Sequence, residues 1–228
     1  MKLKKMKENN KILPSLLSAN FLNLTKDLDE LKKIGIDQIH YDVMDGNFVP
    51  NISFGNGILN QLSKGDHFKY DVHLMVNDPE KHIENYINDS VKGVTWHHET
   101  LTYEEEHKLI KTVRQWNDDL DIGISIKPKT NIEQIYEFLP NIDIILIMSV
   151  EPGFGGQKFI EDSLKKIERL RKYIDERNLK TKIYVDGGIN DVTASQCFKA
   201  GADYLVAGSY LFGSKDRKVA VEKLVKND

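Results

Sequence analysis

Two hydrophobic patterns follow one another along the whole chain. Short, nearly continuous apolar runs, such as residues 142–148, are typical of strands that are covered on both faces. Between them, apolar residues recur every three or four positions, as in amphipathic helices. Strands are predicted at 12–17, 37–43, 69–74, 92–97, 121–126, 142–149, 182–186 and 203–207. No linker or low-complexity segment interrupts the alternation, which indicates one domain.

Several predicted helices have recognisable ends. Thr102 and Glu105 have the spacing of a capping box. Asp78 stands before a proline, which predicts an N-cap followed by proline at the first helical position. Asn190 opens a further predicted helix, which is expected to end near Gly201.

Eight strand–helix repeats in about 220 residues predict an α/β fold, a single-domain (β/α)₈ barrel. An open doubly wound sheet could use the same alternation. However, the glycine fingerprint that such sheets carry after their first strand is absent here. We expect the barrel to span residues 12–228 and to follow a short, basic, frayed extension at residues 1–11.

Composition excludes several classes of partner. The formal net charge of −3 gives no sequence-wide attraction to nucleic acid or to an anionic membrane. No apolar run approaches the roughly 18 residues that a membrane span needs. The single cysteine, Cys197, excludes an intramolecular disulfide and suits a reducing compartment. The basic start lacks a following apolar segment, so a cytoplasmic protein is expected.

Candidate metal ligands stand at the ends of three predicted strands. Alternation places His40, Asp42 and Met44 on one strand face, and His73 with Met75 repeats part of that pattern. Asp186 ends a later strand and supplies a second carboxylate. Burying two imidazoles and two carboxylates together is costly without a cation. The set suits zinc, iron(II), manganese or cobalt, although a metal-free His–Asp network remains an alternative.

Glycine-bearing turns follow the last three predicted strands. Glycine lets backbone N–H groups approach an anion closely, and phosphate sites in barrels favour this region. We therefore expect a ligand phosphate bound by main chain rather than by an arginine clamp. The turns are Gly153-Phe154-Gly155-Gly156, Gly187-Gly188 and Gly208-Ser209.

A metal at one end and a phosphate at the other would hold a short ketose phosphate in extended form. The metal would acidify the C–H between ketone and hydroxyl and stabilise an enediolate. Asp42 and Asp186, on opposite faces of that intermediate, could remove and return the proton, which inverts the carbon. Met44, Met75 and Met148 would line the site. His97 and His98 end the fourth predicted strand, and either could face the barrel mouth.

Four segments, at residues 40–50, 71–76, 150–157 and 185–189, closely resemble the motifs of the ribulose-phosphate 3-epimerase family. The resemblance runs from Pro14-Ser15 to Gly208-Ser209. It implies a TIM barrel of the ribulose-phosphate-binding type that interconverts D-ribulose 5-phosphate and D-xylulose 5-phosphate in the pentose phosphate pathway. Segment 96–99 departs in detail from the family's usual Phe-His start, which could alter the mouth of the site.

The resemblance also implies roles for individual residues. It implies one divalent metal on His40, Asp42, His73 and Asp186, with Asp42 and Asp186 as the acid/base pair. A homo-oligomer is expected as well. The implied substrate contacts are Ser15, His73, Gly153, Phe154, Gly155, Gly156, Gly187, Gly188, Gly208 and Ser209.

Three other functions compete with this interpretation. A 3-epimerase for a six-carbon ketose phosphate could use the same machinery. A metal-assisted decarboxylase on a similar barrel should carry an Asp-x-Lys-x-x-Asp array, which the sequence lacks. A non-catalytic phosphate-binding module would not need two carboxylates around a metal.

Overall fold

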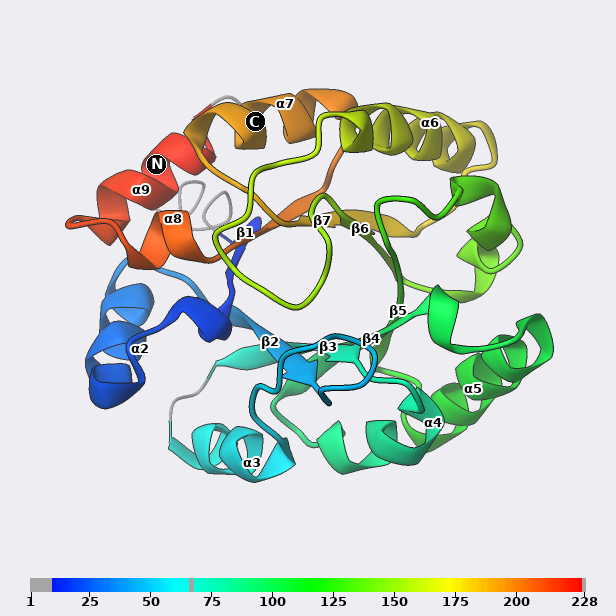
Figure 1. Ribbon diagram of the computed structural model, residues 1–228, viewed down its shortest axis with the longest axis horizontal. Helices are drawn as coiled ribbons and strands as arrows, with labels where there is room; N and C mark the ends of the chain where they lie inside the picture. Colours follow the sequence, from blue (N-terminus) through cyan, green and yellow to red (C-terminus); the bar gives the residue numbers. More distant parts are fainter. Residues whose placement is uncertain (1–9, 66–67, 227–228) are drawn as a thin grey trace.

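Eight parallel strands form the centre of the computed structural model, which describes residues 10–65 and 68–226. Helices surround this ring of strands (Figure 1). The predicted (β/α)₈ barrel is therefore confirmed. The strands are β1 (Ile12–Pro14), β2 (Gln38–Met44), β3 (Lys69–Met75), β4 (Val91–His97), β5 (Asp121–Ile126), β6 (Ile144–Met148), β7 (Lys182–Asp186) and β8 (Tyr204–Ala207).

The barrel closes between its first two strands. Hydrogen-bonded neighbours follow the order β1-β8-β7-β6-β5-β4-β3-β2, so β1 and β2 lie at the two ends of that order. A parallel bridge joins Ser15, just after β1, to His40 in β2. Closure of the barrel thus brings two of the predicted site residues together.

Helices cover the outside of the barrel after most strands. Between β5 and β6 the described chain forms only short helical turns, so this repeat lacks the expected full helix. None of the described helices is long and apolar enough to cross a membrane. The α-helices are α2 (Leu24–Lys33), α3 (Asn56–Gly65), α4 (Pro79–His82), α5 (Tyr103–Trp116), α6 (Asp162–Glu176), α7 (Asp191–Ala200), α8 (Ser209–Phe212) and α9 (Arg217–Leu224). Short helical turns occupy Leu16–Ser18, Phe21–Asn23, Ile83–Tyr86, His98–Thr100, Ile132–Ile135 and Leu139–Asn141.

The helix ends follow the sequence signals with one exception. Thr102 and Glu105 form the predicted capping box of α5, and Asn190 caps α7 through a box of its own. Gly201 ends α7 in the left-handed conformation, with φ of 107°. Asp78 precedes α4 as predicted, but its side chain makes no cap hydrogen bond. Its carboxylate pairs instead with Lys81 Nζ at 3.1 Å.

Two apolar layers hold the barrel, one between strands and helices and one inside the ring. Tyr184 belongs to the inner layer, where it fills the interior beneath the mouth. Lys182, two residues earlier on the same face, keeps its side chain 55% exposed at the opposite rim. The inner layer comprises Leu13, Ile144, Leu146, Met148, Val150, Tyr184 and Val206.

The start of the described chain is attached to the barrel. Asn10 Nδ2 donates to Asp37 Oδ2 at 2.7 Å, and the Lys11 carbonyl accepts from Leu205 N at 2.9 Å. Strand β1 ends at Pro14 rather than at residue 17, because the chain then turns into a short helix at Leu16–Ser18. Residues 1–9 of the predicted extension lie outside the described residues.

Candidate active site at the barrel mouth

The carboxyl ends of the strands and the loops that follow them enclose a cavity with an empty volume of about 550 Å³. His40 and His73 are fully buried and contact Asp42 at this end of the barrel. The predicted residues that line the cavity are Ser15, Asp42, Met44, Met75, Met148, Gly153, Phe154, Gly155, Gly156, Asp186, Gly187, Gly188, Gly208 and Ser209.

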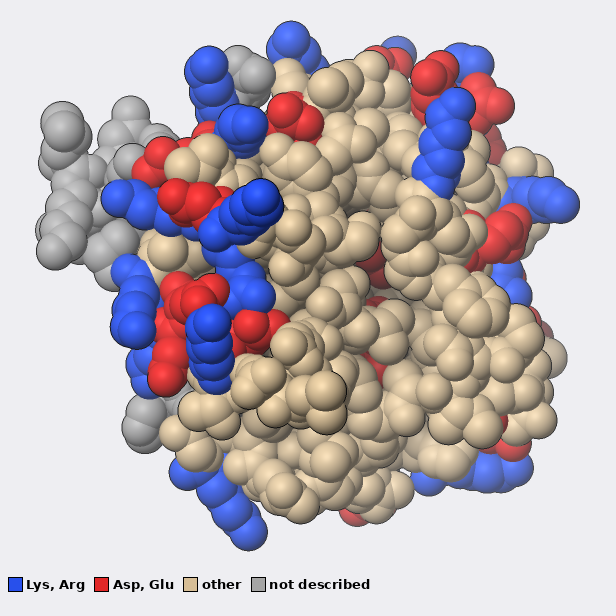
Figure 2. Space-filling model, turned by 60° about the vertical axis from the view of Figure 1, so that its left-hand side comes forward, with Lys and Arg blue, Asp and Glu red and all other residues tan. Residues whose placement is uncertain are grey.

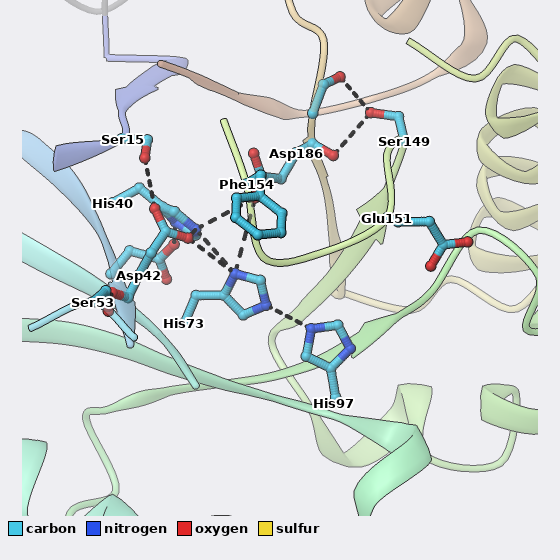
Figure 3. Close-up of polar contacts among 12 residues, drawn as sticks. Ser15, His40, Asp42, Ser53, His73, His97, Ser149, Glu151, Phe154 and Asp186 are labelled. Atoms are coloured by element: carbon cyan, nitrogen blue, oxygen red, sulfur yellow. Dashed lines mark hydrogen bonds and ion pairs between the residues drawn. The ribbon is translucent and has the colours of Figure 1, made fainter. Parts of the chain in front are cut away.

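The four predicted metal ligands converge from β2, β3 and β7 (Figure 3). His40 Nε2 lies 3.3 Å from His73 Nδ1 and 3.3 Å from Asp42 Oδ1. His73 Nδ1 is 3.4 Å from Asp42 Oδ1. Asp186 Oδ2 is 3.9 Å from each of these two ring nitrogens. One ligand atom from each of the four residues therefore lies within 4.8 Å of the others.

This geometry fits a divalent metal. Ligands about 2.1 Å from a tetrahedral zinc lie roughly 3.4 Å from one another, close to the distances among His40, His73 and Asp42. Two imidazole nitrogens and two carboxylate oxygens also form a donor set that suits several transition metals.

Hydrogen bonds hold the far side of three of these four ligands, His40, His73 and Asp42. His40 Nδ1 contacts Asp71 Oδ2 at 2.7 Å, and His73 Nε2 contacts His97 Nε2 at 3.0 Å. Ser15 Oγ donates to Asp42 Oδ2 at 2.6 Å. Such outer partners orient metal ligands and fix the histidine tautomers.

Electrostatics in the cluster favour a central positive charge. Burial disfavours an ionised Asp42, yet the imidazole of His40 holds the pKa of Asp42 well below its usual range. Burial likewise disfavours a charged His40, but Asp42 and Asp71 raise its pKa well above the usual value. Burial and the charge of Asp42 raise the pKa of Asp186 to about 7. A proton on His40 or a metal cation can supply the charge that this arrangement favours.

Backbone geometry shapes the other end of the cavity. Gly187 and Gly188 have positive φ of 117° and 63°. A Cβ on Gly188 would lie 2.5 Å from Phe159 N, and one on Gly187 would lie 2.5 Å from Val150 Cγ2. The N–H groups of Gly187, Gly188 and Gly208 have no partner among the backbone hydrogen bonds of the described residues. They are therefore free to bind an anion.

No lysine or arginine lines this cavity among the described residues. Figure 2 shows acidic atoms at the bottom of the central hollow, while the lysines and arginines of this face lie away from its opening. A phosphate here would depend on main-chain donors, as the sequence predicts.

Comparison with known proteins assigns the chain to a family. The sequence model of the ribulose-phosphate 3 epimerase family matches residues 11–212. The chain belongs to this family. The ribulose-phosphate 3-epimerase of Bacillus subtilis is 37% identical over 94% of this chain and 97% of the relative. The chloroplastic ribulose-5-phosphate-3-epimerase of Arabidopsis thaliana is 39% identical over 92% of this chain and 74% of the relative.

Solved structures support the fold of this family member. The 3-hexulose-6-phosphate synthase of Salmonella typhimurium superposes with a TM-score of 0.65 at 15% identity, over 95% of this chain and 97% of the other. The orotidine 5'-phosphate decarboxylase of Pyrococcus horikoshii gives 0.62 at 14% identity, over 95% and 98%. At such low identity, the likeness concerns the barrel alone.

Sequence reasoning about this epimerase-family chain missed several polar residues. Asp71 shares a strand face with His73, so alternation could have identified it. Ser149 Oγ donates to the carbonyls of Asp186 and Gly187 at 2.9 and 2.7 Å, and so holds the end of β7. The sequence around Ser149 gives no signal for that role, because it depends on the packing of the loop after β6.

The two adjacent histidines at the end of β4 have different partners. One of the two was expected to face the barrel mouth, and His97 is the one that contacts His73 there, fully buried. His98 turns away from the mouth, and its Nδ1 contacts Glu106 Oε2 at 2.5 Å. Phe154 lines the cavity (Figure 3). Its exposed fraction is 55%.

Proposed function

We propose that this chain interconverts D-ribulose 5-phosphate and D-xylulose 5-phosphate by epimerisation at C3, in the pentose phosphate pathway. The observation that carries the proposal is the pairing of Asp42 and Asp186. One carboxyl has a pKa held well below its usual range and the other a pKa near 7, at a single cluster that fits a metal. Two carboxyls with opposed proton affinities suit removal of a proton by one and its return by the other. Membership of the family supports the same activity.

His40, Asp42, His73 and Asp186 would hold one divalent ion. Zinc, iron(II), manganese and cobalt all suit these donors. When bound, the ion would acidify the substrate's C3–H and stabilise the charge of an enediolate. The hydrogen bonds from Ser15, Asp71 and His97 support this role, because each holds a ligand with its free atom toward the common centre.

In the proposed reaction, ionised Asp42 accepts the proton from C3 of D-ribulose 5-phosphate. Protonated Asp186 then donates a proton to C3 from the opposite face, which gives D-xylulose 5-phosphate. The reverse reaction exchanges the two roles. The methionines at positions 44, 75 and 148 line the cavity and would supply apolar surface that offers no competing proton.

At the far end, the main chain would bind the substrate phosphate. The unpartnered N–H groups of Gly187, Gly188 and Gly208 support this assignment. Ser15, His73, Ser209 and the segment Gly153 to Gly156 complete the proposed substrate contacts.

A coupled epimerase assay on the purified, metal-loaded chain tests the proposal. We expect D-ribulose 5-phosphate to be converted with a higher kcat/KM than six-carbon ketose phosphates. No conversion of the five-carbon substrate with any of the four metals would contradict the proposed function. A higher kcat/KM for a six-carbon substrate would favour the related 3-epimerase instead.

The proposal includes a catalytic domain at residues 12–228, a cytoplasmic location and a homo-oligomer. Light scattering on the purified chain tests the last of these, because a mass of one chain, 26.2 kDa, would contradict it.

A further inference from the structure

His97 connects the cluster of four candidate metal ligands to a carboxylate outside it, that of Glu99. Its Nε2 lies 3.0 Å from His73 Nε2, and its Nδ1 lies 3.1 Å from Glu99 Oε2. The two imidazole rings are stacked, with centroids 5.0 Å apart. Phe48 packs on His97 from the loop after β2, with ring centroids 4.6 Å apart. His97 is fully buried, so its ring nitrogens have only these protein partners close by.

Glu99 is held in turn by the loop after β5. Its Oε1 accepts from Lys127 N at 2.7 Å and from the Thr130 hydroxyl. Burial raises the pKa of Glu99, but hydrogen bonds from His97, Thr130 and Lys127 lower it to about 2. Glu99 is therefore ionised and can only accept hydrogen bonds.

The direction of each hydrogen bond follows from this carboxylate. Glu99 accepts, so His97 Nδ1 must carry the proton. The facing Nε2 atoms of His97 and His73 need one donor and one acceptor, and a His97 ring with its proton on Nδ1 offers the lone pair of its Nε2. His73 Nε2 must then be the donor. The lone pair of neutral His73 is thereby left on Nδ1, the atom that faces His40 and Asp42.

We propose that His97 and Glu99 are positioning residues, which fix the tautomer and ring orientation of His73 so that its Nδ1 lone pair points into the metal cluster. This inference rests on the proposed function, because it requires that the cluster binds a metal. Neither residue was among the predicted site residues. Their role is to act through His73 rather than to touch the substrate.

Adjacent His98 provides a matched control. It follows His97 directly, and its ring makes a similarly close contact to a carboxylate, that of Glu106. However, it contacts none of the four cluster residues in the described structure. A His98→Gln variant therefore removes a histidine–carboxylate pair but leaves the hydrogen bonds that join Glu99, His97 and His73 unchanged.

The test measures the dissociation constant of Zn²⁺ by competition with a chromophoric chelator. Changes to outer partners of metal ligands typically weaken metal binding by about 10- to 100-fold, and we expect this loss for His97→Phe. His97→Gln should recover much of it, because the amide oxygen can accept from His73 Nε2. Glu99→Gln should also weaken binding, because its NH₂ group must face either the His97 Nδ1–H or the Lys127 N–H. His98→Gln should leave the constant unchanged.

Ring ¹⁵N NMR of the Zn²⁺-loaded chain gives a second readout. We expect Nε2 of His73 to carry the proton in the unsubstituted chain. Zn²⁺ binding by both His97→Phe and Glu99→Gln with unchanged affinity would overturn the inference while leaving the metal site intact. A proton on His97 Nε2 would overturn it as well. Failure of the unsubstituted chain to bind any of the four metals would instead overturn the proposed function, and the inference with it.

Discussion

The proposed main-chain phosphate site leads to a prediction about individual glycines of the cavity. Adding a side chain at a glycine of the cavity should block the phosphate, but the glycines are not equivalent. A Cβ on Gly188 would collide with the Phe159 backbone at 2.5 Å, so Gly188→Val would disturb folding as well. A Cβ on Gly155 would meet only Ser18 Oγ, at 3.6 Å. Ser18 Oγ also lies 2.6 Å from the Cβ position of Gly208, so the Ser18 hydroxyl lies beside both position 155 and the third glycine turn.

The expected fall in kcat/KM follows from the number of backbone N–H donors that the phosphate would lose. Hydrogen bonds to a charged acceptor each contribute about 1.5 to 3 kcal/mol. If the valine displaces the phosphate from two of the three N–H groups at Gly187, Gly188 and Gly208, the loss is about 3 to 6 kcal/mol. That corresponds to a fall in kcat/KM of roughly 10²- to 10⁴-fold, mainly through KM.

The assay compares D-ribulose 5-phosphate with unphosphorylated D-ribulose in the unsubstituted chain and in Gly155→Val. D-Ribulose should be a very poor substrate for both proteins, because it lacks the group that positions C3. The substitution should therefore matter only for the phosphorylated substrate, and Zn²⁺ affinity should not change. Gly57→Val, in α3 and outside the cavity, controls for the added bulk. The reasoning is refuted if Gly155→Val lowers kcat/KM for both substrates by the same factor.

Three further predictions concern the carboxylates, the metal and a histidine outside the site. Asp42→Asn and Asp186→Asn should each lower kcat by at least about 10²- to 10⁴-fold. With the unsubstituted chain in D₂O, solvent deuterium should enter C3 of the product. Rapid turnover by either variant would contradict the two-base scheme. A chelator should abolish activity, and readdition of zinc, iron(II), manganese or cobalt should restore it. Full activity in protein that elemental analysis shows to be metal-free would exclude a catalytic role for the metal. Burial opposes a charge on His98, but the carboxylate of Glu106 has the larger effect and raises the pKa of His98. The pair should therefore stabilise the fold below about pH 6.5, and this stabilisation should be lost as pH rises through the raised pKa. The difference in Tm between the unsubstituted chain and His98→Gln should therefore shrink from about pH 5.5 to about pH 9, and a constant difference would contradict the pairing.

Local signals in the sequence predict the barrel and most of the cluster, because both depend on alternation within single strands. His40 and Asp42 share a face of β2 whatever the neighbouring strands do. The outer partners depend instead on how separate strands pair. Ser15 reaches Asp42 only because the barrel closes beside β2, and Ser149 holds β7 only because the loop after β6 packs there. The close contacts of Gly187 and Gly188 to Val150 and Phe159 depend on the same packing.

The choice between His97 and His98 shows where sequence reasoning ends. The pairing of β3 with β4 shifts register between Tyr70 and Asp71, so that Tyr70 pairs with Val91 but Asp71 pairs with Gly93. An unshifted register would pair Asp71 with residue 92, and alternation would then turn residue 98 toward the site instead of residue 97. The extra residue in β4 reverses that outcome and brings His97 to His73. A one-residue bulge at the base of the barrel thus decides which histidine meets the four candidate metal ligands at its mouth.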